Sequence, residues 1–139
     1  MVLLVLDTSV VLKWFKEEIH TEIALKIKEE FINGVHEIVE PDLILYEIAN
    51  AMRYSKLFNQ TLIKESLSNL IDMEMDIVIP TQEILLRAVN LSYSYEISLY
   101  DAVYIALAEL INATMITADE KLYEKIKELK FVKSIVDFK

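Results

Sequence analysis

The sequence of 139 residues contains no cysteine, one glycine and two prolines. Without cysteine, thiol catalysis, cysteine-bound zinc and iron–sulfur clusters are excluded. A single glycine, Gly34, excludes the glycine-rich phosphate motifs G-x-G-x-x-G and G-x-x-x-x-G-K-[ST]. It also disfavours a hairpin-rich β fold, whose tight turns need glycine. Because His20 and His36 are the only histidines, a three-histidine metal site is impossible, and oxygen ligands must hold any metal ion, which indicates Mg²⁺, Mn²⁺ or Ca²⁺.

Positive charge is also scarce, since 14 Lys and Arg stand against 23 Asp and Glu and give a net charge of −9. An acidic surface repels phosphate backbones, which disfavours broad electrostatic binding to nucleic acid. No apolar run approaches the length of about 18 residues that a membrane-spanning helix needs. The N-terminus lacks the basic region and cleavage site of a signal peptide. We therefore expect a cytoplasmic protein that does not enter a membrane.

Short apolar runs alternate with amphipathic segments along the whole chain. The pattern predicts strands at 1–6, 37–40, 76–79, 113–117 and 131–138, and helices at 9–18, 21–33, 41–56, 61–73, 81–95, 98–111 and 119–129. This alternation predicts the α/β class, with a parallel sheet covered by helices on both faces. No linker, repeat or shift in composition interrupts residues 1–139, so we expect a single domain.

Four acidic residues lie where a carboxylate needs an explanation. Asp7 directly follows the first predicted strand, and Asp119 lies just beyond the fourth. Ligands of open α/β sheets bind at the carboxyl ends of the strands. Glu47 and Asp101 lie inside helical segments that are apolar almost all round. A buried carboxylate there is costly unless it is paired or bound to a metal.

Each of these acids also has a purely structural interpretation. Asp7 would cap the following helix, and Glu47 would face water on the single exposed stripe of its helix. The stretch Ser98–Asp101 matches a capping box, and so does Thr117–Glu120. Asp119 would then be an acid that the helix dipole favours.

Taken together, the four acids predict a metal site, because the predicted topology brings them to one edge of one sheet. Carboxylates that converge there would repel one another unless a divalent cation neutralised them. Mg²⁺ or Mn²⁺ held in this way activates water for the hydrolysis of a phosphodiester. The hydroxyls of Thr8, Ser9 and Thr117 are candidates for orienting the ligands, and Asn50 shares the helix face of Glu47.

The acidic motifs, in their order along the chain, resemble those of a known family. Asp7-Thr8-Ser9, Glu47 with Asn50, Tyr100-Asp101-Ala102 and Thr117-Ala118-Asp119-Glu120 look like the successive motifs of PIN-domain ribonucleases, with the VapC-type toxins of prokaryotic type II toxin–antitoxin pairs the nearest match. The resemblance covers essentially the whole chain. It implies a five-stranded parallel sheet of order 3-2-1-4-5, a homodimer and a cognate antitoxin that covers the site.

The resemblance also implies a chemistry. Asp7, Glu47, Asp101 and Asp119 would be the acidic tetrad that binds Mg²⁺ or Mn²⁺ and hydrolyses single-stranded RNA. Asp7, Asp101 and Asp119 would be the main ligands, and Glu47 a further ligand or the base. Two alternatives within this family remain: an RNA-processing nuclease without a toxin role, and a catalytically silent module that binds a protein. Outside this family, a phosphoryl-transfer domain of another α/β type with Asp7 as the nucleophile is disfavoured, because Ser9 stands where a second aspartate is expected.

Several other residues receive structural interpretations. Trp14 is expected in the core, and Lys13 in solvent. His20 and His36 are expected to be structural or solvated. The lysines between 121 and 133 are expected to form surface ion pairs with the interleaved glutamates. The tyrosines between 93 and 104 fit RNA stacking, a dimer interface or the core, and the sequence leaves these three roles open.

Overall fold

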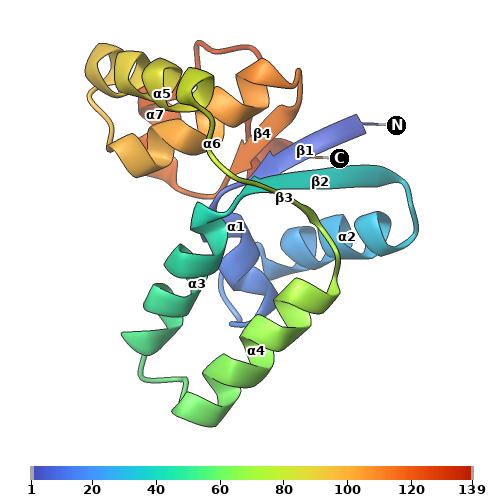
Figure 1. The fold of residues 1–139 in the computed structure, drawn as a ribbon. Coiled ribbons are helices and arrows are strands. Elements are labelled where there is room, and N and C mark those ends of the chain that lie inside the picture. The colour runs from blue at the N-terminus through green and yellow to red at the C-terminus, as the bar shows by residue number, and fades with distance from the viewer. Residues whose placement is uncertain (1, 139) are drawn as a thin grey trace.

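The computed structural model describes residues 2–138 (Figure 1). Its centre is a five-stranded sheet made of β1 (Val2–Leu6), β2 (His36–Pro41), β3 (Asp76–Val78), β4 (Thr114–Thr117) and β5 (Val132–Ser134). The strand order is β3-β2-β1-β4-β5, and every neighbouring pair is parallel. Both the α/β class and the expected order are confirmed.

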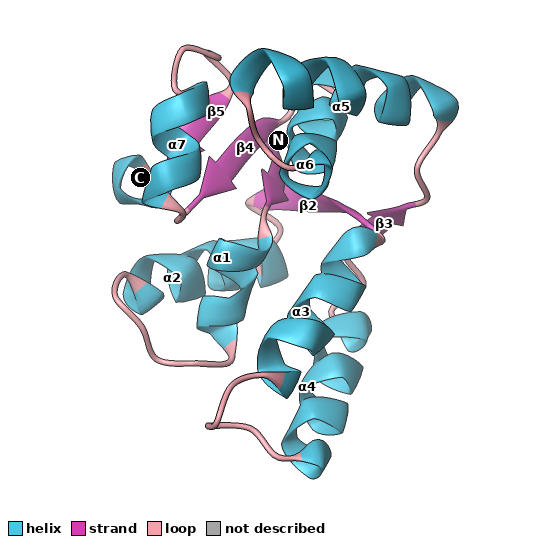
Figure 2. Ribbon diagram, turned by 90° about the vertical axis from the view of Figure 1, so that its left-hand side faces the viewer, coloured by secondary structure: helices cyan, strands magenta, loops and turns pink. Residues whose placement is uncertain are grey.

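Helices cover both faces of the sheet (Figure 2). One face carries α5 (Gln82–Tyr95) and α6 (Leu99–Leu110). The other carries α1 (Thr8–Val11), the 3₁₀ turn η1 (Leu12–Trp14), α2 (Thr21–Ile32), α3 (Leu43–Arg53) and α4 (Gln60–Asp72). The short helix α7 (Glu120–Ile126) packs beside β4 and β5. No helix formed by residues 2–138 is long and apolar enough to cross a bilayer.

Packing in the core places two candidate residues close to the sheet: Asp7, which follows β1, and Asp101, in the first turn of α6. Leu4–Leu6 of β1 are buried, as expected for a central parallel strand covered on both faces. Helix α6 is buried from Ala102 to Ala108 and packs against β1, β2 and β4. Because α6 starts at the edge where β1 and β4 end, its first turn lies next to the ends of both strands.

Local capping signals define several helix ends as the sequence predicts. Thr81 and Ser98 accept hydrogen bonds from the backbone N–H groups of Ile84 and Asp101 and cap α5 and α6. Gly34 follows the last turn of α2 with φ +75°, a left-handed conformation that glycine adopts without steric cost.

The expected helix over 9–18 is wrong in its extent, because only α1 and η1 form there. The indole N–H of Trp14 donates to the carbonyl oxygen of Ala24 at 2.8 Å, which ties η1 against α2. Lys13 is buried and pairs with Glu18 at 3.3 Å between Nζ and Oε1. The core position of Trp14 is confirmed, whereas the expectation of a solvated Lys13 is wrong.

Two further boundaries differ from the prediction. Pro41 does not open a helix but ends β2, opposite Val78 of β3. Its missing N–H disrupts no pairing there, because the N–H of Asp42 donates to the carbonyl oxygen of Val78. The last strand is only Val132–Ser134, since the Ser134 hydroxyl accepts from the N–H of Val136 and the chain turns into a 3₁₀ helix, η2 (Ile135–Asp137).

Candidate active site

Asp7 lies at the carboxyl end of β1 and is buried. The hydroxyl of Ser9 donates to Oδ1 of Asp7, and the hydroxyl of Thr117 donates to Oδ2, both at 2.5 Å. Asp7 stands at the N-cap position of α1, but its side chain makes no capping hydrogen bond. The carboxylate is therefore held by hydroxyls from two segments and is not used to start the helix.

The ends of β1 and β4 are tied together by the same two hydroxyls. The N–H of Ala118 donates to the Ser9 hydroxyl at 2.8 Å, and the N–H of Asp119 donates to the Thr117 hydroxyl at 3.1 Å. The carboxylate of Asp119 accepts from the N–H of Leu122 at 3.0 Å and caps α7. The cap is thus Asp119 and not Thr117, so the capping box that begins at Thr117 does not form. Asp119 is exposed beside the site.

Glu47 reaches the site from α3. Its Oε1 accepts from the Thr8 hydroxyl at 2.8 Å and from the Tyr104 hydroxyl at 2.6 Å. The interpretation that Glu47 simply faces water is therefore wrong. Burial, together with the hydrogen bond to Glu47, raises the pKa of Tyr104 far above its usual value. Tyr104 thus remains a neutral donor that fixes the Glu47 carboxylate, a role that the sequence did not single out.

Asp101 lies in the first turn of α6, and its charge interacts with those of Asp7, Glu47 and Asp119. Its N–H donates to the hydroxyl of Ser98 at 3.0 Å, so one half of the expected capping box forms. Burial raises the pKa of Asp101, and the charges of Glu47 and Asp119 raise it further. Burial also raises the pKa of Asp7 to about 7, and the charge of Asp101 adds to the shift. The four carboxylates therefore share one electrostatic environment at one edge of the sheet.

The site contains oxygen donors that suit Mg²⁺ or Mn²⁺ but does not form a closed cage. Within residues 2–138, no group of three or more Asp, Glu or His side chains is arranged to hold a metal ion directly. Mg²⁺ keeps several of its waters and binds through one or two carboxylates, so a complete protein cage is not required. Burial disfavours the ionised form of Asp7, and the hydrogen bonds from Ser9 and Thr117 offset this only in part, so a cation would stabilise the carboxylate further. The donor set therefore fits such an ion, and the metal remains a prediction.

Asn50 is the one candidate that the structure leaves apart from the others. It is exposed on α3, and its side chain forms no hydrogen bond with a residue of the described range 2–138. The predicted hydroxyls Thr8, Ser9 and Thr117 all contact an acid of the site.

Comparison with known proteins identifies the fold family. The model of the PIN domain family matches residues 4–128. This chain belongs to the PIN domain family.

Individual relatives agree with this assignment. The PIN domain is 29% identical over 131 residues to "Ribonuclease VapC3" of Pyrobaculum aerophilum, which covers 91% of this chain and 96% of that protein. Its fold resembles the VapBC2 structure from Rickettsia felis, bound to a promoter DNA fragment, with a TM-score of 0.73 and 15% identity over 95% of this chain and 98% of the other. It also resembles VapBC-1 of nontypeable Haemophilus influenzae, with a TM-score of 0.69 and 17% identity over 97% and 99% of the two chains.

One buried acid of this PIN domain escaped the sequence interpretation. Glu40 of β2 is fully buried, and its Oε1 accepts from the N–H of Leu6 at 2.6 Å. The backbone pairing of β1 with β2 extends to Leu4 and Ile38, and beyond it the Glu40 side chain continues the contact between the strands. Its Oε2 has no hydrogen-bond partner among residues 2–138. Burial raises the pKa of Glu40 well above the usual value, so burial favours the neutral form of this side chain.

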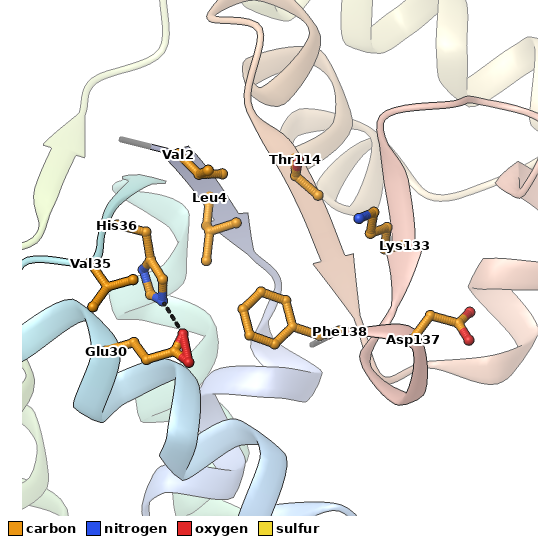
Figure 3. A pocket seen from close by; sticks show the side chains of 9 residues that line it. All are labelled: Val2, Leu4, Glu30, Val35, His36, Thr114, Lys133, Asp137 and Phe138. Atoms are coloured by element: carbon orange, nitrogen blue, oxygen red, sulfur yellow. Dashed lines mark ion pairs between the residues drawn. The ribbon is translucent and has the colours of Figure 1, made fainter.

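A cavity lies near the starts of the central strands (Figure 3), and none of the four candidate acids lines it. It has a volume of about 350 Å³ and is bounded by the starts of β1, β2 and β4 and by Phe138. The buried ring of His36 lies against it, and its Nε2 is 3.6 Å from Oε2 of Glu30. His36 is thus a structural residue, as the sequence interpretation has it.

The burial of His36 predicts a loss of stability in mild acid. Burial lowers the pKa of His36 below its ordinary value of 6.5, and the charge of Glu30 offsets this only in part. Below pH 6.5 the unfolded chain therefore binds the proton more readily than the folded chain does. As the pH falls from about 7 to about 5, we expect the free energy of unfolding of the wild type to drop relative to His36→Phe.

Urea unfolding of both proteins across this range measures the difference. The acids with raised pKa values are present in both proteins, so their contributions to the pH dependence of the unfolding free energy cancel in the comparison. A gap between the two unfolding free energies that stays constant with pH would show that His36 titrates alike in the folded and unfolded chains.

Proposed function

We propose that this PIN domain is a Mg²⁺- or Mn²⁺-dependent endoribonuclease that hydrolyses phosphodiester bonds of single-stranded RNA, as the toxin of a toxin–antitoxin pair. The observation that carries the proposal is the convergence of Asp7, Glu47, Asp101 and Asp119 from four elements at one edge of the sheet. The relative of 29% identity is named a ribonuclease, which supports the reaction class.

Each acid has a distinct role in the proposal. Asp7, Asp101 and Asp119 would hold the metal ion, which when bound supplies activated water and neutralises charge on the phosphate. Ser9 and Thr117 orient both oxygens of Asp7 and limit its rotation. Glu47, held by Thr8 and Tyr104, keeps Oε2 free of these two bonds, so that this oxygen can accept a proton from water or join the ligands.

The proposed partners are RNA, a cognate antitoxin and a second copy of this chain, all in the cytoplasm. Structural neighbours include VapBC complexes, which supports an antitoxin as partner. Apolar side chains are exposed on α5, including Leu86 and Tyr93, which supports a homodimer across that helix. Sedimentation of the purified chain, alone and with the candidate antitoxin, tests both associations.

The replacement of Asp119 by asparagine tests the proposal at an exposed acid. Asparagine also caps helices well, so the fold of Asp119→Asn is expected to persist. Removal of a residue that only hydrogen-bonds to a metal ligand typically reduces activity by about 10–100-fold. Because Asp119 is proposed to bind the metal directly, Asp119→Asn should reduce RNA cleavage by more than this. Cleavage of labelled single-stranded RNA is measured with Mg²⁺ and again with EDTA, which should abolish it.

The neighbouring acid provides a matched control. Glu120 is also exposed and lies in the first turn of α7. Glu120→Gln removes the same charge one residue away and should leave cleavage unchanged. Equal cleavage by Asp119→Asn and Glu120→Gln, or full cleavage in EDTA, would contradict the proposed metal-dependent reaction.

A further inference from the structure

A small cleft opens directly beside two of the acids. It has a volume of about 170 Å³ and is lined by the loop before α6 and by α7. Asp101 and Asp119 line it together with the hydroxyl-bearing Ser98 and two cations, Lys121 and Lys125. In a chain of net charge −9, this juxtaposition places positive charge at the edge of the acidic site.

The two lysines lie on the same side of α7. They are four residues apart, a spacing that puts both side chains on one helix face, and both are exposed. The Nζ of Lys125 donates to the carbonyl oxygen of Glu96 at 2.9 Å, which holds the ammonium group at the cleft. An ammonium group has three donors, so this bond leaves two for another acceptor.

Neither lysine forms the surface ion pair that the sequence interpretation expected. Within residues 2–138, no carboxylate lies within ion-pairing distance of Lys121 or Lys125. Further along the same segment, Lys127 does pair with Glu124, at 2.8 Å. The expected pairing is therefore wrong for the two lysines that line the cleft.

We propose that Lys121 and Lys125 form a phosphate-binding subsite, which holds a backbone phosphate of the RNA against the carboxylates of α6 and α7. This inference rests on the proposed ribonuclease function and names the contact that the acidic chain makes with its substrate. The chain as a whole repels RNA, so attraction must come from a local source. Lys121 and Lys125 provide it beside Asp101 and Asp119, because neither lysine is held in a close ion pair by a carboxylate of residues 2–138.

The chemistry of the contact defines what it contributes. Lysine binds phosphate as a point charge and reads no base. The subsite therefore adds affinity for any single strand and positions the backbone, while the choice of sequence lies elsewhere. Binding through it releases counterions, which gives a slope of log affinity against log salt of about −0.7 per neutralised phosphate on a single strand.

The test compares variants that remove lysine charge, in binding and in cleavage. In an Asp7→Asn background, which prevents cleavage, anisotropy of a short fluorescein-labelled single-stranded RNA of mixed sequence is titrated with Mg²⁺ present. Measurements run from about 50 to about 200 mM salt. We expect Lys121→Gln/Lys125→Gln to bind about tenfold more weakly at low salt and to have a slope shallower by about 0.7, the value for one neutralised phosphate. With Asp7 intact, the double variant should raise KM more than it lowers kcat.

Lys127→Gln/Lys130→Gln is the matched control, because it removes the same charge from the same segment but outside the cleft. It should retain the affinity and slope of the parent, and both double variants should melt close to it. If the lysines of the cleft affect binding no more than the control pair does, the subsite is overturned while the ribonuclease proposal stands. If the wild type neither binds nor cuts the RNA with Mg²⁺ or Mn²⁺, the proposed function itself fails.

Discussion

Asp7→Asn should abolish RNA cleavage and at the same time make the metal-free protein more stable at neutral pH. Burial raises the pKa of Asp7 from 3.8 to about 7. Between these two values the folded chain holds a proton that the unfolded chain has released, so stability falls as the pH rises through this window. Above pH 7 the ionised carboxylate costs about 4 kcal/mol, since each pKa unit corresponds to about 1.4 kcal/mol.

The asparagine variant avoids this cost while keeping the local contacts. Its amide oxygen can accept from the hydroxyl of Ser9, and its amide nitrogen can donate to that of Thr117. In EDTA at about pH 8 we expect Asp7→Asn to exceed the wild type by about 2–4 kcal/mol in unfolding free energy, with most of the gain gone by about pH 5. Urea denaturation at several pH values measures the gain. Mg²⁺ should stabilise only the wild type.

Asp76→Asn is the control for this experiment, because Asp76 is exposed at the start of β3. It should change neither cleavage nor the pH dependence of stability. Retained cleavage by Asp7→Asn would remove Asp7 from the reaction. A stability difference that is the same at pH 5 and pH 8 would show that burial does not oppose ionisation at this position.

Glu40→Ala should destabilise the fold by about 2–4 kcal/mol, whereas Glu40→Gln should stay within about 1 kcal/mol of the wild type. Alanine leaves the buried N–H of Leu6 without its acceptor and opens a cavity between β1 and β2. Glutamine keeps the acceptor oxygen and is neutral, which is the form that burial favours at this position. Urea denaturation separates the two variants.

Cleavage by the same pair shows whether the strand contact supports the site. Leu6 directly precedes Asp7, so the hydrogen bond from its N–H to Glu40 fixes the backbone next to the candidate site. Cleavage should fall in Glu40→Ala under conditions where the variant is folded, and glutamine should restore it. If alanine and glutamine give the same stability, the hydrogen bond to Leu6 contributes nothing measurable.

Much of the fold follows from local pattern. The apolar run of β1, the left-handed Gly34 after α2 and the caps Thr81 and Ser98 all depend on neighbours in the chain. The predicted element boundaries are wrong where a contact between residues distant in sequence sets the backbone conformation. The helix after Asp7 is short where Trp14 bonds to Ala24 and the buried Lys13 pairs with Glu18.

The candidate site also contains residues that local sequence pattern identifies and residues whose role depends on tertiary contacts. An acid that ends an apolar strand identified Asp7, and an acid in an apolar helix identified Glu47 and Asp101. The same signal was present at Glu40, which ends an apolar stretch before Pro41, but its role depends on Leu6 of the neighbouring strand. Tyr104 was one of several clustered tyrosines, and only the packing of α6 against the sheet brings it to Glu47.

By itself, the sequence determined the α/β class, the strand order through its family resemblance, the absence of thiol and glycine-loop chemistry, and the four acids. Apart from the strand order, which the resemblance implied, these depend on composition and on periodicity along the chain. Only the tertiary structure decided that Ser9 and Thr117 hold Asp7, that Glu40 ties β1 to β2, and that Lys121 and Lys125 line the cleft without an ion pair to a carboxylate of residues 2–138. The reason is physical: burial and hydrogen bonding between residues far apart in sequence set the charge state and the direction of each side chain, and local pattern does not encode them.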